Sequence, residues 1–152
     1  MDKIWLKEYP PGIPAEIDPE QYTSLKAMVE ESLSRHRQHD AYVLMGRTLR
    51  YGELDTLSGR FGAWLQAQGF AKGERIAIML PNLLQYPVAM FGALRAGLVV
   101  VNTNPLYTAD ELRHQLIDSG ATAIVILENF CHVLQQVVAE AQKIVADALA
   151  RT

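Results

Sequence analysis

Three short loops carry the side chains that could do chemistry in this chain. PNLLQYP covers residues 81–87, NTNPLYT covers residues 102–108 and ENF covers residues 128–130, and each directly follows an apolar run. Amide and phenol groups set between apolar walls are a common way to bind a small organic ligand. The side chains that we predict to line a substrate cleft are Asn82, Tyr86, Asn104 and Tyr107.

A structural role is the equal alternative for these four side chains. Asparagine commonly satisfies the backbone of a turn, and a tyrosine can fill the edge of a core while its hydroxyl stays at the surface. Residue types and spacing do not decide between the two roles. No residue of the chain is predicted to be catalytic.

Motifs for phosphate and metal binding are absent. Neither GxGxxG nor GxxxxGK[ST] occurs, so the sequence predicts no Rossmann dinucleotide site and no P-loop. A receiver-type magnesium site would need carboxylates at the strand ends, where this chain has proline and asparagine. The histidines, which are His36, His39, His114 and His132, have no recognised metal-ligand spacing with Cys131. We therefore predict no metal site.

The composition is that of one globular domain. The chain has 152 residues, of which 49% are hydrophobic and 20% charged, which argues against disorder. A net charge of −3 gives no electrostatic reason to expect nucleic acid as a partner. A single cysteine, Cys131, rules out an internal disulfide and agrees with a cytoplasmic location.

Neither a signal peptide nor a membrane span is predicted. The first residues, MDKIWLKEYPPGIP, contain no apolar run long enough for a signal-peptide core. The most apolar stretch, residues 87–102, is interrupted by Arg95 and Gly97 and falls short of the roughly 20 residues that span a bilayer. Peripheral contact with a membrane, such as the inner membrane, stays an alternative.

The first 23 residues are predicted to form an extended arm. Pro10, Pro11, Pro14 and Pro19 lie within it, and prolines at this density exclude a continuous helix. We expect the arm to lie on the surface of the domain. Its aromatic residues, Trp5, Tyr9 and Tyr22, are interpreted as packing anchors.

A helix, a hairpin and a second helix follow the arm. Apolar residues recur at helical spacing from Ser24 to about Arg37. Residues 41–44 and 48–51 are short strand-like runs, and Gly46 and Arg47 between them predict a β-hairpin turn. A second helical period begins near Leu54 and stops at Gly69, a residue favoured just after a helix end.

The rest of the chain alternates between strands and helices. The predicted strands are residues 75–80, 98–101 and 123–127, and the predicted helices are residues 83–96, 108–119 and about 130 onward. Wholly apolar strands separated by helices belong to a parallel sheet that is covered on both sides. We predict an α/β fold with a parallel, doubly wound sheet and helices on both faces, preceded by the arm, a helix and a short β-hairpin.

The segment YTADE predicts a helix start at Thr108. The Thr108 side chain can cap the helix while Glu111 reaches back to the cap residue, and Tyr107 can pack against Leu112. These roles are structural, and they assign no chemistry to Thr108 or Glu111.

Several linked segments resemble one enzyme family. PNLLQYP, RAG, VVNTNPLYT and the pattern ExxxQLxDSGA lie in order along the chain. Together with IWLKEYPPGIPAEIDPEQY and TLRYGEL upstream, they are similar to the N-terminal part of AMP-forming acyl-CoA synthetases of the adenylate-forming superfamily. The resemblance covers residues 3 to about 138 and points in particular to the bacterial long-chain fatty-acid–CoA ligases.

The resemblance implies a two-step reaction. A fatty carboxylate attacks the α-phosphate of ATP to give an acyl-adenylate and pyrophosphate, and the thiol of CoA then displaces AMP. Mg²⁺ and hydrogen-bond donors neutralise the polyphosphate charge. The family supplies them from a Ser/Thr/Gly-rich loop and a C-terminal lid, and no TSGTTG-like or YTGGTTG-like string occurs here. The resemblance therefore implies an N-terminal fragment, which we expect to be inactive alone and to bind ATP, CoA or Mg²⁺ only weakly.

Alternatives to the inactive fragment concern what the domain binds. One is a non-enzymatic module of the same ancestry that binds a fatty acyl group or dimerises, because an unpaired sheet edge invites self-association. A small flavodoxin-like binding domain is a third, which the linked segments disfavour. After Val138 the chain departs from the family, because it keeps a helical period through Ala141, Ile144, Val145 and Leu149. We divide the chain into the arm, residues 1–23, and an α/β subdomain, residues 24–152.

Overall fold

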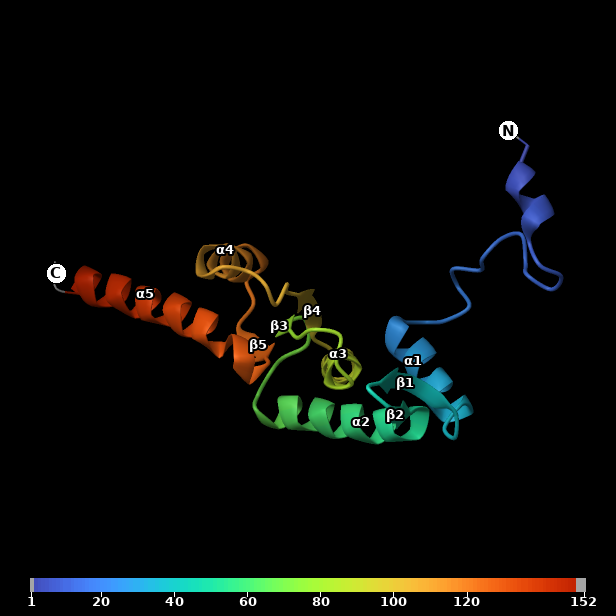
Figure 1. The fold of residues 1–152 in the computed structure, drawn as a ribbon, viewed down its shortest axis with the longest axis horizontal. Helices are drawn as coiled ribbons and strands as arrows, with labels where there is room; N and C mark the ends of the chain where they lie inside the picture. The colour runs from blue at the N-terminus through green and yellow to red at the C-terminus, as the bar shows by residue number, and fades with distance from the viewer. Residues whose placement is uncertain (1, 150–152) are drawn as a thin grey trace.

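A three-stranded parallel sheet forms the centre of the molecule (Figure 1). The computed structural model describes the backbone of residues 2–149 and the side chains of residues 2–140. The sheet consists of β3 (Arg75–Met79), β4 (Val99–Asn102) and β5 (Ala123–Ile126), with β3 in the middle. The predicted parallel sheet is confirmed, and each strand lies within a residue or so of its predicted range.

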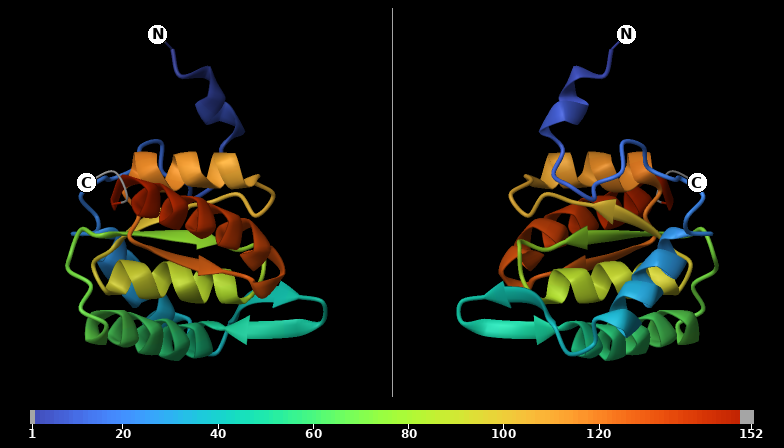
Figure 2. Two further views of the ribbon diagram at one scale, coloured as in Figure 1. Left: turned by 90° about the vertical axis from the view of Figure 1, so that its left-hand side faces the viewer. Right: turned by 90° about the vertical axis from the view of Figure 1, so that its right-hand side faces the viewer.

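Helices cover both faces of this sheet (Figure 2). On one face α3 (Gln85–Arg95) packs on the strands and is backed by α2 (Tyr51–Ala67). On the other face lie α4 (Ala109–Ser119) and α5 (Cys131–Leu149). This is the predicted doubly wound arrangement.

The central strand shows why the sheet needs two covering layers. Ile76 and Ile78 of β3 pack toward α3, while Met79 packs with Leu112 of α4 and Val137 of α5. All three β3 side chains are at most 2% exposed. Burial on both faces therefore holds for β3, whereas Val99 on the edge strand β4 is 49% exposed.

Two glycines set the spacing between α2 and α3. A Cβ atom added to Gly62 would lie 2.9 Å from the carbonyl oxygen of Gly92, and one added to Gly92 would lie 2.9 Å from the carbonyl oxygen of Ser58. These separations are shorter than any ordinary Cβ contact. The helices therefore approach backbone to backbone, which side chains at these positions would prevent.

An ion-pair network closes the same helix interface. Arg95 of α3 donates to the Asp55 carbonyl at 2.8 Å and to the Ser58 hydroxyl at 3.0 Å. Its guanidinium also pairs with the Asp55 carboxylate at 3.0 Å and the Glu30 carboxylate at 3.4 Å. One arginine thus ties α3 to α2 and to α1 (Leu25–Arg35).

The predicted helix start at Thr108 is confirmed. The Thr108 hydroxyl accepts from the Glu111 amide at 3.4 Å, and the Glu111 carboxylate accepts from the Thr108 amide at 2.8 Å. These hydrogen bonds from Thr108 hold the pKa of Glu111 below its ordinary value. Tyr107 packs against the core around Leu112, as the stapling pattern predicts.

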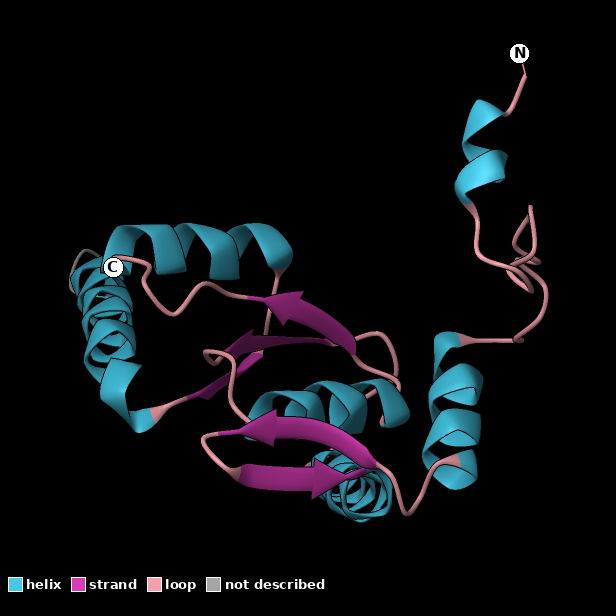
Figure 3. Ribbon diagram, turned by 45° about the vertical axis from the view of Figure 1, so that its right-hand side comes forward, coloured by secondary structure: helices cyan, strands magenta, loops and turns pink. Residues whose placement is uncertain are grey.

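The hairpin forms where predicted but turns one residue earlier. Its strands are β1 (Asp40–Leu44) and β2 (Arg47–Arg50), paired antiparallel (Figure 3). The turn residues are Met45 and Gly46, with φ of 49° and 75°, which suits the tight turn that best matches strand twist. Arg47, predicted in the turn, therefore belongs to β2, and Tyr51, predicted in the strand, begins α2.

The arm differs from its prediction in two ways. Residues Ile4–Glu8 form a short 3-10 helix, η1, and the arm extends away from the domain instead of lying on it (Figure 1). Trp5 and Tyr9 are 50% and 42% exposed, so they do not anchor it. The backbone hydrogen bonds of its described residues are local, as between the Ile13 amide and the Pro10 carbonyl at 3.2 Å. Of the three aromatic residues interpreted as anchors, only Tyr22 is partly buried.

At the other end, a short 3-10 helix η2 (Glu128–Phe130) leads into α5. The backbone of α5 continues to Leu149, which confirms that the helix runs on past Val138. The side chains of Ala141, Ile144, Val145 and Leu149 lie outside the described side chains.

Candidate functional site

The strand order marks one place in the sheet where a crevice is expected. From β3 the chain crosses to β4 on one side and then returns past β3 to β5 on the other. In open α/β sheets, ligands bind beyond the carboxyl ends of the strands where the order reverses in this way. The place to inspect is therefore the carboxyl end of β3 and β5.

A cavity of about 360 Å³ opens there, which we call the switch-point crevice. Its lining comprises Phe61 of α2, Leu80 and Leu83 after β3, Gln85, Val88 and Ala89 of α3, and Val125, Ile126, Leu127 and Glu128 at the end of β5. Eight of these ten side chains are apolar. The crevice suits a hydrocarbon or aromatic group with a polar end near Gln85 or Glu128.

Local structure explains how these side chains reach the crevice. Leu80 ends the buried run of β3 and is 9% exposed. Leu127 keeps an extended backbone, with φ −74° and ψ 136°, and so carries the direction of β5 to Glu128. Phe61 comes from the face of α2 that packs on α3, and its ring stacks on Trp64 with centroids 5.8 Å apart.

Nucleotide polyphosphate does not fit the switch-point crevice. Among the described residues that line it, none is a lysine or arginine and only Glu128 carries a carboxylate. Phosphate binding requires basic side chains or a glycine-rich cradle of amides, and Mg²⁺ in such sites is held by carboxylates together with substrate phosphates. Within the described residues, no three His, Cys, Asp or Glu side chains gather in a way that could hold a metal ion.

Tyr86 joins the two predicted substrate loops. Its hydroxyl donates to the Asn102 side-chain oxygen at 2.6 Å, so α3 is bound to the start of NTNPLYT. The Gln115 amide of α4 donates to the Asn102 carbonyl at 3.0 Å. Asn102, which was not among the predicted residues, therefore connects loop and helices on both sides of the sheet.

Of the other predicted residues, Asn104 and Tyr107 share one turn, in which the Tyr107 amide donates to the Asn104 carbonyl at 3.2 Å. Asn104 accepts from the Leu106 amide at 3.0 Å and so stabilises its own turn. Tyr107 fills the edge of the core, and Asn82 is exposed on the loop after β3. Asn104 and Tyr107 thus have the structural roles given as the alternative, and none of the four predicted residues lines the switch-point crevice. A substrate-lining role stays a prediction for them.

Sequence reasoning missed Phe61, Gln85 and Glu128. The loops PNLLQYP and ENF were identified, and Gln85 and Glu128 lie in them. Phe61 could not be predicted from the sequence as a site residue, because an aromatic residue on the apolar face of a helix is typical of a hydrophobic core. The strand order is needed to bring these three together, and spacing along the chain does not give it.

Comparison with known proteins identifies the family. The model of the family "AMP-binding enzyme" matches residues 29–151. The chain belongs to this family. It is 53% identical over 143 residues to a long-chain-fatty-acid–CoA ligase of Yersinia pestis, and 54% identical over 139 residues to one of Escherichia coli O6:H1. These alignments cover 93% and 91% of this chain but 25% of each relative, so the chain spans about a quarter of their length.

Solved structures of the family share this fold. A benzoate CoA ligase from Burkholderia xenovorans LB400 superposes with a TM-score of 0.73 at 27% identity. The superposition covers 78% of this chain and 24% of that one. The resemblance to AMP-forming CoA ligases and the α/β fold are thus both confirmed. Among the helices that the structure describes, none combines the length and apolar character needed to cross a membrane.

Proposed function

We propose that this chain is the N-terminal portion of a long-chain fatty-acid–CoA ligase. Such a ligase makes acyl-CoA from a fatty acid, ATP and CoA through an acyl-adenylate. One observation carries the proposal: 54% identity over 91% of the chain to a ligase of that name. Identity at this level over nearly the whole chain favours a long-chain acid over the benzoate of the structural relative.

We propose that this portion contributes apolar surface and not the adenylation machinery. The switch-point crevice has an apolar lining that suits part of an acyl chain. Asn82, Tyr86, Asn104 and Tyr107 are proposed to act at the polar loop edge beside it. We place the binding of ATP, Mg²⁺ and CoA in segments beyond this quarter of the enzyme, because the described lining of the switch-point crevice has no lysine or arginine to bind a polyphosphate.

ATP–pyrophosphate exchange with palmitic acid tests the proposal. The exchange reports reversible acyl-adenylate formation and needs no CoA. The chain alone is expected to give no exchange above background, while a full-length relative assayed alongside gives a strong signal. Exchange that depends on both palmitic acid and this chain would contradict the claim that the adenylation machinery lies elsewhere.

A second candidate function is self-association. Two observations favour it: β4 and β5 are both edge strands of the described sheet, and the arm carries exposed Ile4, Trp5 and Ile17. Size-exclusion chromatography with light scattering measures the mass directly, and a monomer at high concentration would exclude this function. A cytoplasmic location and peripheral membrane contact stay predictions.

A further inference from the structure

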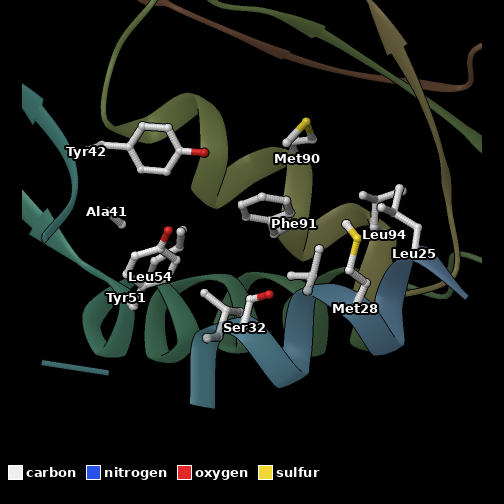
Figure 4. A pocket seen from close by; sticks show the side chains of 12 residues that line it. Leu25, Met28, Ser32, Ala41, Tyr42, Tyr51, Leu54, Met90, Phe91 and Leu94 are labelled. Atoms are coloured by element: carbon white, nitrogen blue, oxygen red, sulfur yellow. The ribbon is translucent and has the colours of Figure 1, made fainter. Parts of the chain in front are cut away.

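A second apolar cavity lies on the far side of α3 from the sheet. It has a volume of about 370 Å³ and opens between α1, α3 and the hairpin strand β1, so we call it the α1–α3 groove (Figure 4). Its floor is made of Val29, Leu33 and Leu54, which are 7%, 2% and 1% exposed. The size falls within the range of small-molecule sites, roughly 300–1,000 Å³.

The groove is polar at one end and apolar at the other. Figure 4 shows Leu25, Met28 and Leu94 together at one end, and Tyr42 and Tyr51 at the other. Met90 and Phe91 of α3 form the wall between the two ends. Flexible methionines adapt readily to a hydrocarbon chain. The lining thus changes from apolar to polar along the groove, as an amphiphilic ligand changes from its hydrocarbon chain to its head group.

Hydroxyl groups provide the polar chemistry. Among the described residues, the hydroxyls of Tyr42, Tyr51 and Ser32 make no hydrogen bond to another protein group. Burial raises the pKa of Tyr42, and the neighbouring Tyr51 raises it further, so the phenol stays protonated and can donate. Each hydroxyl is a donor that a carbonyl oxygen would satisfy.

Among the described residues that line the groove, none is a cation. Two basic side chains on its helices α1 and α3 are already paired, Lys26 with Glu30 at 2.9 Å and Arg95 with Asp55 at 3.0 Å. A head group would therefore be held by neutral hydroxyl donors and not by an ion pair. This favours a carbonyl oxygen over a phosphate, which would require positive charge.

We propose that the α1–α3 groove binds a single-chain fatty acyl compound, with the acyl chain along Met28 and Leu94 and a carbonyl oxygen at Tyr42 and Tyr51. This site is separate from the switch-point crevice and lies on the opposite face of α3. The proposal does not depend on ligase activity. Binding here and ATP–pyrophosphate exchange are separate measurements, so each can fail without the other.

Titration of the complete chain with a fluorescent polyene fatty acid tests this site. Wild type is expected to show saturable binding at micromolar concentration. Met28→Glu places a charge at the apolar end, where Met28 is 36% exposed, and should weaken binding at least about tenfold. Tyr42→Phe removes one donor and should weaken it about fivefold. Lauric acid and its neutral monoglyceride should displace the probe equally well, and a shorter acid less well.

Matched controls separate this site from other surfaces. Ile117→Glu puts the same charge on α4, where Ile117 is 71% exposed, and should leave binding unchanged. Gln85→Trp narrows the switch-point crevice, which is itself proposed to hold part of an acyl chain, so binding that remains in Gln85→Trp and is lost in Met28→Glu belongs to the α1–α3 groove. Circular dichroism identifies any variant that fails to fold, in which case Ala41→Leu, which fills the groove from β1, replaces Met28→Glu.

Three results would overturn the proposal. The first is the absence of saturable binding by folded wild type. The second is equal binding by Met28→Glu and Ile117→Glu. The third is loss of binding in Gln85→Trp alone, which would assign the acyl chain to the crevice.

Discussion

Replacing Gly92 by alanine tests the close packing of α2 against α3. The new Cβ would lie 2.7 Å from Cδ1 of Phe61 and 2.9 Å from the carbonyl oxygen of Ser58. The Phe61 ring can rotate away. The Ser58 carbonyl belongs to the backbone of α2, and so it can move only if the two helices separate.

Two effects of opposite sign set the magnitude. Overpacking of this kind costs about 1–3 kcal/mol, whereas alanine in a helix is about 1 kcal/mol more favourable than glycine. The backbone contact places the cost at the upper end of its range. We expect Gly92→Ala to lower the free energy of unfolding by about 2 kcal/mol, which for a chain of this size lowers Tm by about 4–8 °C.

Urea unfolding followed by circular dichroism measures this change. Gly59→Ala is the matched control at the same helix interface, because its Cβ, on the facing helix α2, would meet the Arg95 side chain at an ordinary 3.5 Å. The control should be neutral or stabilising by up to about 1 kcal/mol. If Gly92→Ala proves as stable as Gly59→Ala, the helices are not held at backbone contact and the reasoning fails.

Three further variants test the interactions that position the elements. Arg95→Met removes a guanidinium that is 20% exposed, with its hydrogen bonds to the Asp55 carbonyl and the Ser58 hydroxyl and its ion pair with the Asp55 carboxylate. We therefore expect the free energy of unfolding to fall by about 1–3 kcal/mol, and an unchanged urea midpoint would refute this. Thr108→Ala should cost about 1 kcal/mol through loss of the cap, measured in the same way. The lowered pKa of Glu111 means that its carboxylate stabilises the fold fully above about pH 4.5, the ordinary value, and loses this effect as the pH falls through the lowered value. Glu111→Gln should therefore have a lower free energy of unfolding than wild type at neutral pH and the same free energy of unfolding in strong acid. A difference between the two proteins that persists in strong acid would contradict this account.

Local elements were predictable because each depends on neighbours in sequence. The capping residues Thr108 and Glu111 are three apart, and their hydrogen bonds form in α4 as predicted. Gly120 ends the same helix with φ of 65°, as a glycine can. The hairpin turn was misplaced by one residue, because Met45 adopts a positive φ that its residue type does not favour.

The candidate site was only partly predictable. The loops after β3 and β5 were identified, since ligands bind beyond strand ends, and Gln85 and Glu128 lie in them. Asn104 holds a local turn and Tyr107 lies at a core edge, and their substrate-lining role stays a prediction. The sequence of a loop does not tell whether a polar side chain stabilises the turn or binds a ligand. Only the hydrogen-bond partner of that side chain distinguishes these two roles.

By itself, the sequence determined the family resemblance, the alternation of strands and helices and the absence of a phosphate-binding loop. Each of these features depends on residues that are close together along the chain. The tertiary structure alone decided the strand order β4-β3-β5, and with it the place of the switch-point crevice. It also decided that Gly62 and Gly92 meet and that α1, α3 and the hairpin enclose a second cavity. These features join residues that are distant in sequence, and packing in three dimensions, not periodicity, brings them into contact.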